Sequence, residues 1–170
     1  MGLAQTIQVS ELVARLVALE FGRNGRVAHL VETPSPGTHL SRSSVQVIPG
    51  KGFAGDHERK SFYKGELVPG REVTAVSLEV LQVLGVDPIV VGDNLITEGF
   101  DLAALEPGDL VEAGGIILER SSREHRPCTV FRDRTSPEAF AAISRERFRG
   151  ALFTVRQGGI LRQGDPIRCL

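Results

Sequence analysis

The residues best suited to chemistry lie in one short segment of the C-terminal half. Residues 119–134, here called the cysteine segment, have the sequence ERSSREHRPCTVFRDR, with five arginines against three carboxylates in a chain of formal net charge −1. His125, Arg126 and Pro127 directly precede Cys128. Adjacent cations stabilise a thiolate, and guanidinium groups match the geometry of phosphate. The segment predicts a reactive cysteine beside an anion-binding surface. The alternative is a buried, inert cysteine flanked by solvated charges.

A glycine-containing turn at residues 50–57 (GKGFAGDH) offers a second group of polar atoms. Glycine permits a close approach of the backbone to a ligand, and successive N–H groups form anion-binding nests. Gly55, Asp56 and His57 are therefore candidate ligand contacts. The alternative is a structural turn in which Asp56 caps its own backbone.

Residues 92–99 (GDNLITEG) form a similar turn. Asn94 either hydrogen-bonds a heterocyclic ligand or caps the loop, and both interpretations stay open. The Gly-Asp pairs at 108–109 and 164–165 predict turns that open strands.

Other motifs add little chemistry. A metal site built from the four histidines (His29, His39, His57 and His125) is improbable, because their spacing in the sequence is not that of metal ligands. The second cysteine, Cys169, stands next to the C-terminus and suggests a packing role. The sequence has no serine-hydrolase elbow, Walker loop or zinc-protease motif, so hydrolase and kinase functions have no support.

Composition and charge exclude several classes of protein. The 170 residues have 20 Lys+Arg, 21 Asp+Glu and a hydrophobic fraction of 41%. This balance argues against binding to a nucleic-acid backbone and against disorder. No apolar stretch reaches the ~18 residues of a membrane span. The N-terminus does not resemble a secretory signal, so we expect a cytoplasmic protein with two free thiols.

The apolar pattern places these segments on a mainly β fold. Val9–Phe21 has apolar residues at helical spacing and predicts a helix with Ser10 as N-cap. We expect this helix to cover the chain's own core, and the alternative is a dimer contact. Short β-like runs separated by Gly, Pro, Asp or Asn follow at Arg26–Val31, Ser44–Ile48, Glu72–Val76, Asn94–Thr97, Leu110–Ala113, Ile116–Arg120, Ala151–Arg156 and Ile167–Cys169.

Two further helices are expected as inserts between strands. One begins near Ser77 and ends before Gly85, and the other opens with the N-cap and N1 proline of residues 136–138 and ends at Gly150. Many short strands with few helices predict an antiparallel β-barrel or sandwich. Thr33–Ser44 is the most loop-like stretch, and it and the cysteine segment are candidates for mobile loops around a pocket.

In this order, the motifs resemble the MOSC domain, a family named for the C-terminal domain of molybdenum-cofactor sulfurases. The resemblance begins near Arg26, so residues 1–25 are expected to be an N-terminal helical extension and residues 26–170 the MOSC domain. Small stand-alone bacterial members, such as hydroxylaminopurine-resistance proteins, are the most similar. The matching pieces are Gly52-x-x-Gly55-Asp56, Arg71-Glu72-Val73-Thr74-x-x-Ser77, Gly92-Asp93-Asn94-Leu95-x-Thr97-x-Gly99-x-Asp101-Leu102, Leu105-x-Pro107-Gly108-Asp109 and Arg126-Pro127-Cys128.

The resemblance implies a barrel with a pocket for the molybdenum cofactor (molybdopterin). Cys128 would be the catalytic residue, as the molybdenum ligand or as the carrier of a persulfide. A thiolate is a soft ligand for such a metal, and basic neighbours suit the pterin phosphate. The residues expected around the cofactor are Gly55, Asp56, His57, Arg71, Asn94, Arg123 and Arg126.

The chain departs from the family pattern in two ways. Family members often have Glu before the asparagine, where this chain has the shorter Asp93. The 170 residues also contain neither the cysteine-desulfurase domain of full sulfurases nor the N-terminal barrel domain of amidoxime-reducing proteins. We therefore expect electrons or sulfur to come from a partner, either a separate flavin or iron–sulfur reductase or a cysteine desulfurase.

The sequence leaves three functions open. The first is a molybdenum-cofactor protein that reduces N-hydroxylated substrates. The second is a non-enzymatic sulfur carrier in which Cys128 bears a persulfide. The third is a ligand-binding barrel without turnover, for which Cys128→Ser would change nothing measurable.

Overall fold

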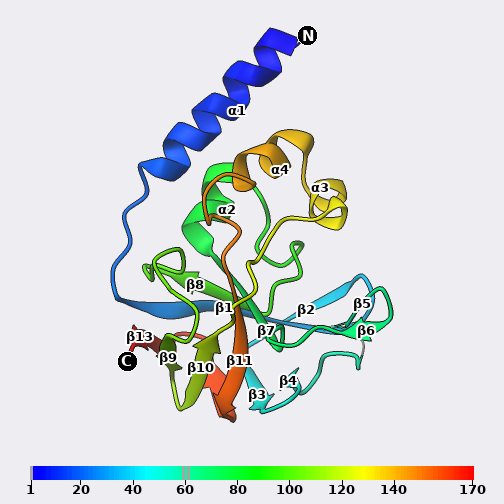
Figure 1. Ribbon diagram of the computed structural model, residues 1–170, viewed down its shortest axis with the longest axis vertical. Coiled ribbons are helices and arrows are strands. Elements are labelled where there is room, and N and C mark those ends of the chain that lie inside the picture. The colour runs from blue at the N-terminus through cyan, green and yellow to red at the C-terminus, as the bar shows by residue number, and fades with distance from the viewer. Residues whose placement is uncertain (1, 59, 61) are drawn as a thin grey trace.

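A closed barrel forms the centre of the computed structural model, which describes residues 2–58, 60 and 62–170 (Figure 1). Seven strands of the described chain make the ring, since β1 pairs with β8 on one side and with β13 on the other. In order around the ring they are β1 (Asn24–Ser35), β13 (Pro166–Cys169), β9 (Leu110–Ala113), β10 (Ile116–Arg120), β11 (Ala151–Gln157), β7 (Val73–Ser77) and β8 (Leu95–Glu98).

Smaller elements extend this barrel. The strand β2 (Thr38–Arg42) pairs with β1 outside the ring. A three-stranded sheet and a short hairpin complete the β structure, and the helices gather at one end of the barrel (Figure 1). These strands are β12 (Gly159–Arg162), β3 (Ser44–Ile48) and β4 (Gly52–Phe53), then β5 (Phe62–Tyr63) and β6 (Glu66–Leu67), and the helices are α1 (Gly2–Val17), α2 (Leu78–Leu84), α3 (Thr129–Arg134) and α4 (Pro137–Ile143).

The predicted mainly β barrel with inserted helices is confirmed, with one difference in strand direction. The barrel is mixed, because β7 and β8 are parallel. Parallel neighbours need a crossover connection, and α2 provides it. As expected, α2 begins after Ser77 and ends at Gly85, whose φ of 66° is the left-handed conformation that glycine adopts at low cost.

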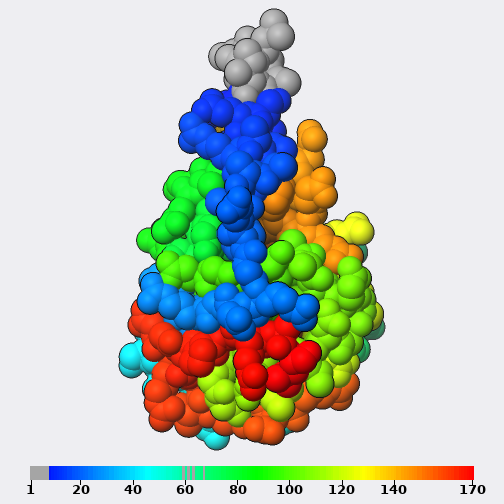
Figure 2. Space-filling view, turned by 90° about the vertical axis from the view of Figure 1, so that its left-hand side faces the viewer, coloured from blue at the N-terminus to red at the C-terminus, as the bar shows by residue number. Residues whose placement is uncertain are grey.

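Two apolar clusters hold the fold together. One fills the barrel and includes the fully buried Phe53 and Phe153, while the other lies between the barrel and the helices. Leu16 of α1 belongs to the second cluster and is 1% exposed. Figure 2 shows α1 running between the green segment around α2 and the orange segment around α4. The expected N-terminal helix therefore does cover the chain's own core.

Helix boundaries differ from the sequence predictions. The first helix begins at Gly2 and ends at Val17, so Ser10 lies in its interior and is not an N-cap. The last helix, α4, has the expected cap at Ser136, whose side chain accepts from Ala139 N. It ends at Ile143 and not at Gly150, because the backbone turns away through the positive φ of Glu146.

The segment Thr33–Ser44, expected to be a loop, is mainly a β-hairpin. β1 continues to Ser35, Pro36 and Gly37 form the turn, and β2 returns along β1. The apolar pattern of the sequence did not indicate this hairpin, because β2 is an outer strand with mostly exposed residues and no apolar alternation. The helix α3 within the cysteine segment was also not predicted. No helix of the described residues is long and apolar enough to cross a membrane.

Candidate functional site

A cavity of about 270 Å³ lies between the tip of the β1–β2 hairpin, the loop before β8 and the cysteine segment. These three segments are far apart in the sequence, and the barrel brings them to the helical end of the molecule. The cavity contains the side chain that the sequence singled out, Cys128. Its lining consists of Thr33, Pro36, Gly37, His39, His57, Lys60, Arg71, Thr74, Val91, Gly92, Asp93, His125, Cys128, Val130, Phe131, Arg134 and Arg149.

Cys128 stands at the mouth of this cavity. Cys128 is exposed, and its backbone is extended. It follows Pro127 and directly precedes α3. The structure gives its thiol no hydrogen bond or ion pair with any described residue. The buried, inert cysteine that the sequence left open is thereby excluded. Cys169, in contrast, is half-buried and packs against the barrel core, as expected.

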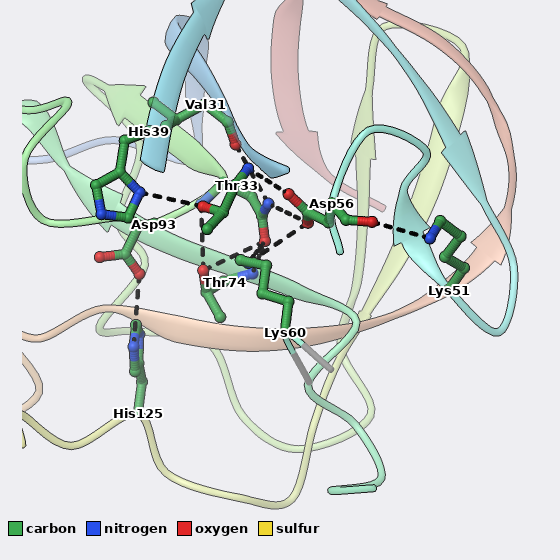
Figure 3. Close-up of polar contacts among 10 residues, drawn as sticks. Val31, Thr33, His39, Lys51, Asp56, Lys60, Thr74, Asp93 and His125 are labelled. Atoms are coloured by element: carbon green, nitrogen blue, oxygen red, sulfur yellow. Dashed lines mark hydrogen bonds and ion pairs between the residues drawn. The ribbon is translucent and has the colours of Figure 1, made fainter. Parts of the chain in front are cut away.

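Asp56 and Asn94 form a buried hydrogen-bond pair beneath the cavity floor (Figure 3). Asn94 Nδ2 donates to Asp56 Oδ2 at 2.8 Å, and Thr33 N donates to Asp56 Oδ1 at 2.7 Å. Thr74 N donates to Asn94 Oδ1 at 3.2 Å. The pair therefore ties the turn at 50–57 to β1, β7 and the start of β8. Asp56 does not cap its own turn, because its carboxylate bonds other segments.

Lys60 sits directly on this pair. Its ammonium donates to Asn94 Oδ1 and lies 3.6 Å from Asp56 Oδ2. The side chain is 13% exposed. Burial lowers the pKa of Lys60 below its usual range, with Arg71 adding to this effect and the nearby carboxylates opposing it.

A second set of charges makes the opposite wall. Arg149 Nη1 lies 2.7 Å from Asp93 Oδ2, and His125 Nε2 lies 3.5 Å from Asp93 Oδ1. The guanidinium of Arg149 also covers the ring of Phe131 at 5.2 Å. Burial is the largest single influence on Asp93 and acts to raise its pKa, but the nearby basic groups, with Arg149 the strongest, together outweigh it and hold that pKa below its usual range.

The state of His125 corrects one expectation. The sequence predicted it as a cation beside the cysteine, whereas burial and the neighbouring Arg149 lower the pKa of His125 to about 3. The imidazole is therefore neutral at pH 7. The positive charge of the cavity comes instead from Lys60, Arg71, Arg134 and Arg149, against the single lining carboxylate of Asp93.

The structure brings together only part of the predicted site. The lining includes Cys128, His57 and Arg71. Asn94 is fully buried and fixes the position of Asp56 without lining the cavity. The other predicted residues lie apart from it, with Gly55 against the Glu32 side chain, Arg123 exposed, and Arg126 in a neighbouring cavity of about 430 Å³ behind His125 and Arg149.

Sequence reasoning missed three cationic contributors. Arg149 follows α4 in a stretch with no motif, and only the fold brings it to Asp93. Lys60 had a weak signal, its position four residues after Asp56. Arg134 belonged to the arginine-rich segment, where nothing distinguished it from its neighbours. Its Nη1 donates to Val91 O at 3.4 Å.

Comparisons with known proteins agree with this architecture. The family model for the MOSC domain matches residues 66–168, which include most of the barrel and Cys128. No curated protein matches the chain significantly by sequence. Among solved structures, the YuaD protein from Bacillus subtilis is similar, with a TM-score of 0.65 and 20% identity over 85% of this chain and 94% of that one.

Two further crystal structures show the same fold. The YiiM protein from Geobacillus stearothermophilus has a TM-score of 0.62 and 18% identity over 86% of this chain and 75% of that one. The YiiM protein from Escherichia coli has a TM-score of 0.61 and 19% identity over 85% of this chain and 69% of that one.

Proposed function

The chain belongs to the MOSC domain family, and from that membership we propose that it binds the molybdenum cofactor with Cys128 as a molybdenum ligand. The observation that carries the proposal is the exposed thiol of Cys128 in a cavity lined by four cationic side chains. A thiolate is a soft metal ligand, and the cations suit an anionic cofactor.

The residues present fit such a ligand. Two buried ring nitrogens around the cavity, His39 Nε2 and His125 Nδ1, have no hydrogen-bond partner among the described residues. Buried polar atoms are rarely left unpaired unless a ligand or water completes them. The described residues contain no group of three His, Cys, Asp or Glu side chains placed to hold a metal. A metal held by Cys128 would take its further ligands from the pterin.

Each part of the cavity has a role in this proposal. Cys128 holds the metal at the mouth, where substrate arrives, while Arg71 and Arg134 bind the anionic end of the cofactor. The Asp93–Arg149 ion pair fixes the part of the cavity wall between Cys128 and these two arginines. When bound, the cofactor supplies a centre for two-electron chemistry.

We propose that the reaction is the reduction of N-hydroxylated substrates, with electrons from a separate flavin or iron–sulfur reductase. In such a reaction R–NH–OH takes up two electrons and two protons and gives R–NH₂ and water. The similarity to small stand-alone family members supports this substrate class, and the exposed position of Cys128 supports access from solvent.

Metal and pterin content tests the proposal directly. The wild type, Cys128→Ser and the matched control Cys169→Ser are expressed in a host that makes the cofactor, and molybdenum and pterin fluorescence are measured on each. We expect near-stoichiometric metal in the wild type and the control, and loss in Cys128→Ser. Equal metal in all three variants would contradict ligation by Cys128.

A persulfide carrier is the second candidate, because the same exposed thiol is within reach of a protein acceptor. It predicts no metal or pterin in any variant. After incubation with cysteine and a cysteine desulfurase, intact mass would show one added sulfur atom in the wild type and Cys169→Ser, and none in Cys128→Ser.

A further inference from the structure

The reductive cleavage of an N–O bond needs a proton donor, which the proposed function leaves unassigned. The hydroxyl oxygen leaves as water only after it gains a proton, and the reductase supplies electrons alone. A side chain that delivers this proton must line the cavity, carry a proton at neutral pH and release it readily.

The charge states of the lining side chains leave few candidates. The three arginines keep their protons in proteins. Asp93 is ionised and His125 is neutral, as shown above. Burial and the nearby Arg134 lower the pKa of His39, so that its ring also lacks the second proton at pH 7. Among the described lining residues, Lys60 remains as a nitrogen donor whose pKa is lowered by burial.

Lys60 is held in one position by fixed acceptors. Its ammonium contacts Asn94 Oδ1 and Asp56 Oδ2, and each of these side chains is bonded in turn to a backbone N–H, from Thr74 and Thr33 respectively (Figure 3). An ammonium has three N–H donors, and the hydrogen bond to Asn94 Oδ1 uses one of them.

A second cavity gives Lys60 a route to solvent. This cavity, of about 340 Å³, is also lined by Lys60 and lies on the side of the 50–58 turn and Glu72. Lys60 therefore lines both the cavity of Cys128 and a second cavity, from which it can regain a proton.

Three charged side chains and one neutral imidazole face Lys60, and they come from four segments. Asp56, Asp93 and Arg71 act on it from the 50–57 turn, the loop before β8 and the approach to β7, and the neutral His39 faces it from β2. Burial is the largest influence and favours the neutral amine. Such an amine releases its proton more readily than an exposed lysine does.

We propose that Lys60 is the catalytic residue that protonates the oxygen atom leaving an N-hydroxylated substrate, an inference that rests on the proposed function. The proton passes from Lys60 Nζ to the hydroxyl oxygen as the N–O bond breaks, and the electron pair from the reductase remains on the nitrogen. A solvent proton completes R–NH₂, and the neutral Lys60 amine regains its proton from water.

The first test measures Lys60 itself, without cofactor or activity. The chain has three lysines, Lys51, Lys60 and Lys64, so selective ¹³C-lysine labelling gives three side-chain signals. The signal lost in Lys60→Arg identifies Lys60. We expect it to titrate below the ordinary lysine value of about 10.4 in the folded protein, and at that value in urea. Titration at the ordinary value in the folded protein would overturn the proposal.

The second test measures reduction of hydroxylaminopurine by cofactor-loaded protein, with electrons from a chemically reduced viologen. Lys60→Arg keeps the positive charge but cannot release a proton, so we expect kcat to fall about 100-fold with little change in KM. The matched control Lys64→Arg, at an exposed position that lines neither of the two cavities, should keep wild-type kcat.

The pH profile distinguishes the possible outcomes. The wild type should lose kcat at high pH, and Lys60→Arg should lack this limb. A Lys60→Arg protein with wild-type kcat, or a limb that disappears in His57→Gln instead, overturns the role of Lys60 and leaves the proposed function standing. Loaded wild type that reduces no hydroxylaminopurine overturns the proposed function, and the role of Lys60 with it.

Discussion

Arg149 and Asp93 form a close ion pair in the cavity wall, with Nη1 and Oδ2 2.7 Å apart. Arg149 directly precedes Gly150, and Asp93 lies in the loop before β8. Both side chains are at least nine-tenths buried. A buried charge without a partner is costly, so each residue requires the other. The pair allows a carboxylate to stand in the wall of a cavity that otherwise attracts anions.

Removal of one member of this pair should destabilise the protein strongly. Arg149→Met removes the closest cationic partner of the buried Asp93 carboxylate, and we expect the free energy of unfolding to fall by about 3 kcal/mol. Urea unfolding measures this loss. The double variant Asp93→Asn/Arg149→Met removes both charges and should recover part of the stability. The single variant Asp93→Asn completes the comparison. If the double variant loses as much unfolding free energy as the two single variants added together, the two side chains are not coupled.

The buried neutral His125 makes stability depend on pH. Its pKa is about 3 in the folded protein, against about 6.5 in an unfolded chain, so the unfolded state binds more protons between these values. Stability therefore falls as the pH drops below about 6.5, by at most about 1.4 kcal/mol per pH unit from this group. Asp93, whose pKa is also lowered, adds a dependence of the same sign at lower pH.

Urea unfolding at about pH 7, 6 and 5 checks this dependence. His125→Gln should have a shallower loss of stability than the wild type over this range. The control His29→Gln, outside the cavity, should keep the wild-type slope. If His125→Gln has the same slope as wild type, the imidazole is not buried in its neutral form.

Local signals were sufficient for much of the fold and for one residue of the site. The strands Ser44–Ile48, Leu110–Ala113 and Ile116–Arg120 were predicted with their observed bounds, because turn residues flank each apolar run. Cys128 could be found because a lone cysteine within an arginine-rich segment is a signal that the local sequence carries by itself. Arg149 could not, because only long-range packing places it beside Asp93.

The difference between local sequence signals and long-range packing also explains why the sequence analysis assigned Asn94 and Gly55 to ligand contacts. Their residue types suit both binding and structure, and only burial separates the two roles. Asn94 has all its polar neighbours inside the protein, and Gly55 leaves room for the Glu32 carboxylate. A motif shows that a residue type matters at a position but does not show whether it contacts a ligand.

Two glycines of the 50–57 turn should respond differently to alanine. A Cβ on Gly52 would lie 2.0 Å from the backbone oxygen of Glu72, at a φ of 99° that disfavours other residues, and we expect a loss on the order of 3 kcal/mol. A Cβ on Gly55 meets the end of the flexible Glu32 side chain, which can swing away, so we expect a loss below about 1.5 kcal/mol. Urea unfolding of both variants checks the order, and a larger loss in Gly55→Ala would contradict it.

The two cysteines should differ in reactivity. Cys128 is exposed and Cys169 is half-buried against the core, so iodoacetamide at neutral pH should alkylate Cys128 at least about 10-fold faster. Peptide mass spectrometry over time measures both rates. Because Cys128 is exposed and its thiol bonds to none of the described residues, Cys128→Ser should change the unfolding free energy by less than about 0.5 kcal/mol. Equal alkylation rates would show that the cavity mouth is closed in solution.

Replacing Asn94 by aspartate tests the buried pair beneath the cavity. Asn94 Nδ2 donates to Asp56 Oδ2 at 2.8 Å, and Asn94→Asp puts a second carboxylate there with no proton to donate. We expect a loss of about 3 kcal/mol or more at pH 7. At about pH 4–5 one carboxyl takes up a proton and can donate again, so the deficit relative to wild type should shrink. Asn94→Ala loses the same hydrogen bonds without adding a charge, and its deficit should stay constant with pH. If the two deficits change with pH in parallel, repulsion between the carboxylates is not the cause.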